Sequence, residues 1–387
     1  MKSNYRYIVK AFMAMAVIAG TTSCDDFLDR EPMSSISPET YYSTAAQLEA
    51  NLNDEYPNVL PSFGQWTYGI FGEDKGTDNQ IEVNANDRYT QDRWKVPHSE
   101  SDNWKFERIY RINFFLSEAL PKFGEDMSGS QNTISGSVAT IKHYIGEMYF
   151  LRAYEYFKKL QLFGDFPIIN QPLADEMEAL REASKRFPRN EVARFIISDL
   201  DKAYAYMSDV DMATTRINKD VAMLVKSRVA LFEATWLQNF KGTAFVPGGE
   251  GWPGASLHNN YQYPSGNIDN EVKYFLEQAV EASKLVADKY KGSLTENTGV
   301  LQQSADDPSN PYFDMFAQED LSDVKEVLLW RQYARGLSTH NINAAAGRGN
   351  YRIGLTRGFV QNFLMKDGTP VYAHGSYADG DGYYMGD

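Results

Sequence analysis

Helical periodicity is the feature that most constrains this fold. Between residues 138 and 163, apolar side chains recur every three or four positions, at Ile141, Ile145, Tyr149, Ala153, Tyr156 and Leu160. This spacing puts them on one stripe of a single long helix. Gly164 follows, and then Phe166-Pro167, which is typical of a helix end where the chain turns away.

Other segments show the same period. A second strong helix is predicted over 219–239, with Asn218 as its N-cap and an apolar face formed by Val221, Val225, Val229, Phe232 and Trp236. Further helices are expected at about 38–53, 104–120, 190–207 and 271–290. Such a series implies antiparallel helix pairs in a tetratricopeptide-like or α-solenoid-like arrangement, although no regular repeat can be counted.

The segment 240–270 has neither the helical nor the strand period. It is rich in Gly, Pro, Asn and Ser, and it carries Trp252, Tyr261 and Tyr263. A loop of this length is usually functional or mobile. After residue 291 the chain is again loop-rich, with a strand-like run at Val327–Trp330 and a helix start near Thr356. We therefore predict a mainly α fold with long loops and few short strands.

The first 23 residues have the pattern of an export signal. Basic residues are followed by a short apolar run at 11–20 and by small residues at 21–23; the basic residues are Lys2, Arg6 and Lys10. A membrane-spanning helix needs roughly 20 apolar residues, and the acidic residues from Asp25 onward end this run earlier. Residues 1–23 are therefore predicted to be a lipoprotein signal peptide.

Cys24 is the single cysteine of the chain, which excludes an intramolecular disulfide and a thiolate metal cluster. Its place directly after the signal pattern resembles a lipobox, in which the thiol receives diacylglycerol. Thr21 stands where lipoboxes usually carry Leu, and Asp25 and Asp26 resemble the signal for display on the outer surface in Bacteroidota lipoproteins. We expect Cys24 to be the lipidation site that holds the protein to the outer membrane.

Charge and motif content exclude several classes of protein. The formal net charge is −14, and loss of the signal peptide leaves 35 basic against 52 acidic residues. Such a chain repels phosphate backbones, so no nucleic-acid partner is expected. The five histidines form no H-E-x-x-H pattern, and no Gly-rich phosphate-binding pattern occurs. The sequence predicts no cofactor, no metal site and no catalytic residue.

Several motifs in register resemble the SusD/RagB family of outer-membrane nutrient-binding lipoproteins. They are CDDFLDREP after the signal peptide, W-x5-Y-x2-N at Trp104, Tyr110 and Asn113, YFLRAYEYFKKLQLFGDFPII at 149–169, and LTRGFVQNFLMKDGTPV at 355–371. Between the last two come Asp199-Leu200, Arg216, Ser227-Arg228-Val229 and Glu326-Val327, also in the family's order. Members continue well beyond the last motif, so the resemblance implies that part of the C-terminal half is missing.

The resemblance implies a mostly helical protein of tetratricopeptide-like pairs that lies over a SusC-type TonB-dependent transporter. Such proteins capture oligosaccharide or polysaccharide at the cell surface and deliver it, without chemistry. On this basis residues 24–240 form a SusD-like N-terminal helical region. Residues 241–387 form a loop-rich insertion and an incomplete SusD/RagB C-terminal region.

Aromatic residues make up 14% of the chain, and sugar C–H faces stack on Trp and Tyr rings while polar side chains bond the hydroxyls. We therefore take the ligand-binding candidates from aromatic and polar residues in loops: Trp66, Tyr68, Asp78, Asn79, Arg88, Trp94, Trp252, Arg331, Tyr333 and Tyr351. Trp104 and Trp236 fall on core positions. The arginines Arg152, Arg216 and Arg228 are predicted to form buried ion pairs with partners such as Asp199, and Asp165 is predicted to be a turn residue.

Two other functions remain open from the residues alone. An exported helical protein with an aromatic cleft can be a glycoside hydrolase, because 52 acidic residues supply many carboxylate pairs. A helical-repeat scaffold that binds peptides is the second alternative. A hydrolase releases reducing ends, whereas a binding protein retains glycan without product.

Overall fold

The computed structural model describes residues 41–64, 72–82, 103–124, 126–208, 212–301, 304, 306–336, 338–340, 342 and 353–373. The long helices are α3 (Ala45–Val59), α4 (Glu107–Phe123), α5 (Val138–Phe163), α7 (Arg189–Tyr206), α8 (Lys219–Asn239) and α9 (Ile268–Tyr290). Shorter elements are α6 (Met177–Ala183), η3 (Pro253–Ser256), α10 (Pro311–Met315), α12 (Arg357–Val360) and η4 (Val371–Ala373). The protein is mainly helical, as predicted, and no helix of the described residues is long and apolar enough to cross a membrane.

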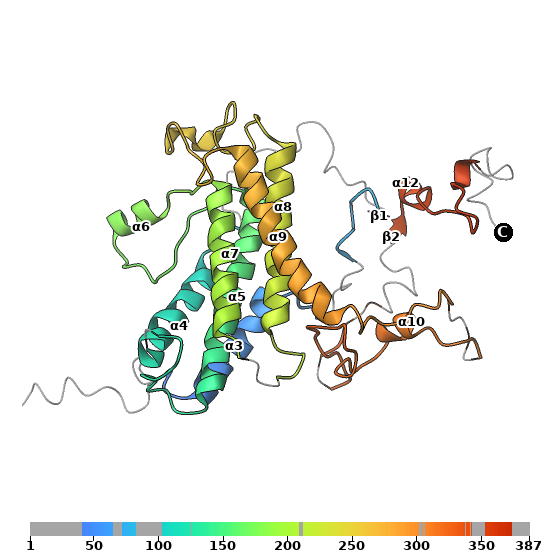
Figure 1. Ribbon diagram of the computed structural model, residues 1–387, viewed down its shortest axis with the longest axis horizontal. Coiled ribbons are helices and arrows are strands. Elements are labelled where there is room, and N and C mark those ends of the chain that lie inside the picture. The colour runs from blue at the N-terminus through green and yellow to red at the C-terminus, as the bar shows by residue number, and fades with distance from the viewer. Residues whose placement is uncertain are drawn as a thin grey trace, which may run out of the picture.

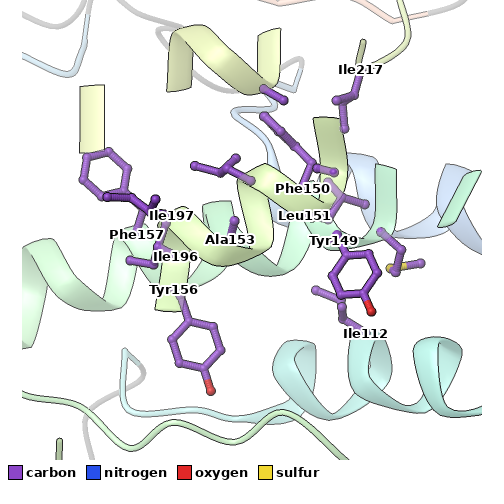
Figure 2. Packing of buried hydrophobic residues seen from close by; sticks show 14 of the residues in the cluster. Ile112, Tyr149, Phe150, Leu151, Ala153, Tyr156, Phe157, Ile196, Ile197 and Ile217 are labelled. Carbon is purple, nitrogen blue, oxygen red and sulfur yellow. The ribbon is translucent and has the colours of Figure 1, made fainter. Parts of the chain in front are cut away.

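From α4 onward, the long helices pack against one another in the order of the chain. α5 contacts α3, α4 and α7, α7 contacts α8, and α8 contacts α9 (Figure 1). α5 is the central helix, and its predicted stripe is buried as expected. Its other faces are buried too, including the polar residues His143, Glu147 and Arg152. Figure 2 labels members of this core: Tyr149, Ala153 and Tyr156 of α5, Ile112 of α4, and Ile196 and Ile197 of α7.

Local signals fix where the best-predicted helices begin and end. Asn218 caps α8 by accepting a hydrogen bond from the Val221 N–H at 3.1 Å, as predicted. Gly164 ends α5 with φ +67°, a conformation that costs glycine little. α3 begins later than expected, because Thr44 and Gln47 form a capping box at its N-terminus.

Buried ion pairs tie the helices together. The Arg152 guanidinium donates to both carboxylate oxygens of Asp199, at 2.7 and 2.9 Å, which joins α5 to α7. Arg216 donates in the same way to Glu147, at 3.0 and 2.7 Å. These two arginines therefore have the structural role predicted for them. Arg228 does not, because its side chain is exposed on α8.

The predicted strand at Val327–Trp330 is wrong. This segment is irregular, and the Trp330 backbone N–H donates to the Thr214 carbonyl at 3.2 Å rather than to a neighbouring strand. A short apolar run does not by itself specify an extended ladder.

The strands among the described residues are β1 (Gln80–Glu82) and β2 (Ile353–Leu355), which pair antiparallel with Gln80 opposite Leu355. They lie apart from the helical layers in Figure 1. The predicted helix start at Thr356 is confirmed, since its hydroxyl accepts from the Phe359 N–H and begins α12.

Candidate functional site

A groove of about 740 Å³ lies between α3, α5, α8 and the segment 329–332. Its buried part is apolar and includes Phe150 and Val221. Half-buried aromatic side chains form its sides: Tyr56, Tyr154 and Trp330. Exposed polar side chains surround its opening: Asn53, Arg228, Arg331 and Gln332. We call this site the α5–α8 groove.

Helix periodicity places the residues on two sides of the α5–α8 groove. Phe150 and Tyr154 are one turn apart on α5, and their rings stack with centroids 6.1 Å apart and planes 19° apart. Val221, Val225 and Arg228 follow at intervals of four and three on α8, so they share one face. Much of the groove is thus built on side chains of long helices, which are more rigid supports than loops.

Hydrogen bonds hold two of the aromatic rings in place. The Tyr56 hydroxyl donates to Glu147 Oε2 at 2.7 Å and accepts from the Ile217 N–H at 2.9 Å. The Trp330 indole N–H donates to Thr214 Oγ1 at 2.8 Å. Since these polar atoms already have partners, both residues offer a ligand mainly their apolar ring surfaces.

Tyr154 keeps its proton at neutral pH. Burial raises the pKa of Tyr154 above its ordinary value, and the nearby Arg228 opposes that rise only in part. A neutral phenol can both donate and accept a hydrogen bond. Tyr154 can therefore bond a hydroxyl-bearing ligand as well as pack against it.

Two of the predicted site residues lie at or beside the α5–α8 groove. Arg331 lines it, donates from Nη1 to the Ser62 hydroxyl, and has its guanidinium 5.5 Å from the ring centroid of Tyr333. The Tyr333 hydroxyl accepts from the Phe63 N–H at 3.2 Å. The segments 61–64 and 331–333, about 270 positions apart, are therefore neighbours.

Asp78 and Asn79 lie elsewhere. They directly precede β1, and their backbone carbonyls accept hydrogen bonds from the hydroxyl and the backbone N–H of Thr356. They thus extend the β1–β2 pairing, and neither lines the α5–α8 groove. The remaining predictions fall outside the described residues: Trp66, Tyr68, Arg88, Trp94 and Tyr351, and the lipidation site Cys24.

Trp252 is only 5% exposed, which leaves little of its ring for a ligand. Its indole N–H donates to Asp165 Oδ2 at 2.8 Å, and Asp165 Oδ1 accepts from the Arg189 backbone N–H at 2.9 Å. Asp165 is thus more than a turn residue, because it links the α5–α7 connection to the 240–267 loop. Trp252 and the half-buried Trp236 line a smaller hollow of about 480 Å³ at this end of the helices.

Of the described residues that line the α5–α8 groove, only Arg331 was among the predicted contacts; Tyr154, Arg228 and Trp330 are among those that were not. The sequence did contain a pattern that marks Tyr154. Phe150 and Tyr154 are a bulky pair four residues apart that does not belong to the predicted α5 stripe, so they define a second face with its own partner surface. No equivalent pattern marked Arg228 or Trp330, because their meeting depends on how distant segments pack.

In the described part of the chain, no group of three or more His, Cys, Asp or Glu side chains could hold a metal ion. The described residues that line the α5–α8 groove offer apolar contact, hydrogen bonding and positive charge. That combination suits a small polar molecule with apolar faces.

Comparisons with known proteins agree with this fold. The SusD-like family described as "Starch-binding associating with outer membrane" matches residues 26–231. SusD-like protein P2 of Formosa agariphila is 25% identical over 253 residues, which cover 62% of this chain and 46% of that protein. SusD-like protein P25 of the same organism is 25% identical over 233 residues, covering 55% and 41%. The chain thus spans less than half the length of these relatives.

A solved SusD-like carbohydrate binding protein from Bacteroides fragilis NCTC 9343 has a similar fold. Its TM-score is 0.53 at 14% sequence identity, and the alignment covers 87% of this chain and 57% of that structure. The family match extends over more than half of the chain and includes α3, α4, α5 and α7 and most of α8. The chain belongs to the SusD-like family.

Proposed function

We propose that this protein is a surface-exposed glycan-binding lipoprotein of the outer membrane. In this proposal it is anchored by acylated Cys24, captures oligosaccharide or polysaccharide, and delivers it to a SusC-type TonB-dependent transporter. The observation that carries the proposal is the α5–α8 groove, which combines aromatic sides, an apolar floor and a polar opening.

The chemistry of the α5–α8 groove matches that of a sugar. A pyranose ring presents C–H groups on its faces and hydroxyls at its edge. The rings of Tyr154 and Trp330 can pack against the faces, and Asn53 and Gln332 can bond the hydroxyls. Its volume of about 740 Å³ is in the usual range for a site that encloses a small ligand. The family description and the carbohydrate-binding neighbour support the same ligand class.

We further propose that the protein binds without cleaving. Glycoside hydrolysis normally uses two carboxyl groups that flank the scissile bond, and none of the described residues lining the α5–α8 groove is acidic. Incubation with glycans it retains should therefore release no reducing ends. Release of reducing ends would favour the hydrolase alternative.

The direct test is glycan retention in affinity gels, with the mature protein and Trp330→Ala. Loss of one aromatic wall should weaken retention about tenfold, since ring contacts contribute about 0.5–1.5 kcal/mol beyond the apolar area they bury. Tyr312→Ala removes a partly exposed ring on α10, outside the groove, and is the matched control. Trp66→Ala and Trp94→Ala test the loop residues that remain part of the proposal.

Each outcome of this test has a clear meaning. Equal weakening by Trp330→Ala and Tyr312→Ala would remove the α5–α8 groove from the proposal. If the wild-type protein retained no glycan at all, the result would favour the hypothesis of a peptide-binding scaffold. Delivery to a transporter is tested separately, by co-purification of a TonB-dependent outer-membrane protein with the tagged lipoprotein.

A further inference from the structure

The α5–α8 groove differs in charge from the rest of the chain. The protein has a formal net charge of −14 and 52 acidic residues. The charged side chains among the described residues that line the groove are both cationic, Arg228 and Arg331. The charge at the groove is therefore opposite in sign to that of the whole chain, whose overall field repels anions.

Neither guanidinium is neutralised by a carboxylate within the described residues. Arg228 is exposed and makes no ion pair there. Arg331 donates to the neutral hydroxyl of Ser62 and lies against the ring of Tyr333. The buried carboxylate of Glu147 accepts from the groove residue Tyr56 and also from Arg216.

The contrast with the other arginines is informative. Arg152, Arg189, Arg194 and Arg216 each donate two hydrogen bonds or more to one carboxylate, on Asp199, Glu233, Glu271 and Glu147 respectively. These pairs stabilise helix packing and leave no net charge to offer a ligand. Arg228 and Arg331 come from α8 and from the 329–332 segment, and both keep free N–H groups at the groove opening.

Resting on the proposed function, we infer that the α5–α8 groove selects acidic glycans, with Arg228 and Arg331 binding a carboxylate or sulfate group on the sugar. A guanidinium has a planar fork of N–H donors that matches both anions. The rings of Tyr154 and Trp330 hold the sugar faces in the same groove, so the anionic substituent and the ring are recognised together. A neutral glycan makes the ring contacts alone.

The test compares acidic and neutral forms of the same backbone by titration calorimetry with the mature protein. One arm uses oligogalacturonates and their methyl esters, which differ in a free carboxylate. The second arm uses sulfated carrageenan oligosaccharides and their desulfated forms. We expect the acidic form of at least one pair to bind about tenfold or more tightly than its neutral form. That advantage should fall between about 50 and about 500 mM NaCl, because salt screens exposed charge.

Variants assign the preference to the two arginines. Arg228→Gln and Arg331→Gln should each lower the acidic-to-neutral affinity ratio about fivefold or more, and Arg228→Lys and Arg331→Lys should restore part of it by keeping the charge. Arg335→Gln removes an exposed arginine outside the groove and should leave the ratio unchanged. Circular dichroism melting of each variant checks that it is folded.

The outcomes separate this inference from the proposed function. Equal affinity for the acidic and neutral forms would overturn the inference and leave glycan binding intact. An acidic preference that survives both glutamine variants would overturn the role of these arginines. Absence of binding to any member of either arm, together with no retention in the affinity gels, would overturn the proposed function and the inference with it.

Discussion

Glu271 illustrates how a buried carboxylate is stabilised in this fold. It has no exposed surface, and it accepts hydrogen bonds from Arg194 at 2.7 and 2.8 Å and from Asn190 at 3.0 Å. Burial alone would raise its pKa, but hydrogen bonds from Arg194, Asn190 and Ser265 together bring the pKa of Glu271 below its ordinary value. The ionised form is therefore the one that the folded state favours.

Replacing Glu271 by Gln should destabilise the protein by about 3 kcal/mol near neutral pH, since it leaves the Arg194 guanidinium without its anion. A carboxyl whose pKa is lowered by folding contributes stability above its unfolded pKa and loses it as the pH falls through the folded value. The difference between wild type and Glu271→Gln should thus shrink below about pH 4. Urea unfolding followed by circular dichroism at about pH 7 and about pH 3 measures both values.

Glu277→Gln is the control on the same helix. Glu277 faces Lys273 at 3.8 Å with both side chains largely exposed, so its loss should change the free energy of unfolding by less than about 0.5 kcal/mol. A penalty for Glu271→Gln that is the same at both pH values would show that lost packing, and not lost charge, causes it.

Two of the ligand-binding candidates, Arg331 and Tyr333, were taken from the later region where the family resemblance implies ligand contacts. They lie at the α5–α8 groove or beside it, and their role in ligand binding stays a prediction. Arg228 was predicted to be buried and is exposed. An arginine on a helix gives the same sequence signal whether a carboxylate faces it or not, because the partner comes from a distant segment.

At the scale of elements, the approach of α7 to α5 depends on one glycine. A Cβ added to Gly146 of α5 would lie 2.8 Å from the backbone nitrogen and from Cγ of Met207, and 2.9 Å from the carbonyl oxygen of Ala203. These atoms belong to the last turn and C-cap of α7. Gly146 therefore permits the end of α7 to rest directly on the α5 backbone.

Gly146→Ala should destabilise the protein, although alanine in a helix interior is normally more stabilising than glycine by about 1 kcal/mol. Two of the three close atoms are backbone atoms, which cannot move away through a side-chain rotation. The end of α7 therefore has to shift. Overpacking of this kind costs about 1–3 kcal/mol. Urea unfolding gives the free energy. Gly292→Ala, where nothing lies within 4 Å of the added Cβ, should change it by less than about 0.5 kcal/mol. A Gly146→Ala variant more stable than wild type would contradict this account of the contact.

The elements themselves differ in how far the sequence predicts them. α5 and α8 have the predicted bounds, because a strong apolar period coincides with Gly164 and Asn218 at their ends. The run at Val327–Trp330 was wrongly predicted to be a strand. Four consecutive apolar residues show no periodicity that would distinguish a strand from an irregular segment packed against the core. The burial of α5 on its polar positions also could not be predicted, because Arg152 and Glu147 are paired with residues from distant segments, Asp199 and Arg216.

At the scale of the whole molecule, the proposed function needs two separate parts. The α5–α8 groove is formed by residues between Asn53 and Gln332, and the proposed anchor is Cys24. The described lining residues begin at Asn53, so we expect loss of the anchor at Cys24 to leave glycan affinity unchanged. Membrane attachment and ligand binding can therefore be separated by a single substitution.

Cys24→Ser should release the protein from the outer membrane. Acyl chains on one cysteine supply the apolar area that holds a lipoprotein to a bilayer, and serine cannot receive them through a thioether. In Bacteroidota cells fed labelled palmitate, the wild-type protein should carry label and sediment with outer membranes, whereas Cys24→Ser should do neither. Thr21→Leu, which supplies the usual lipobox residue, should keep both properties. If Cys24→Ser remains labelled and sediments with the membranes, the proposed anchor is wrong. Retained glycan affinity in the released variant would show that the groove binds glycan independently of the anchor.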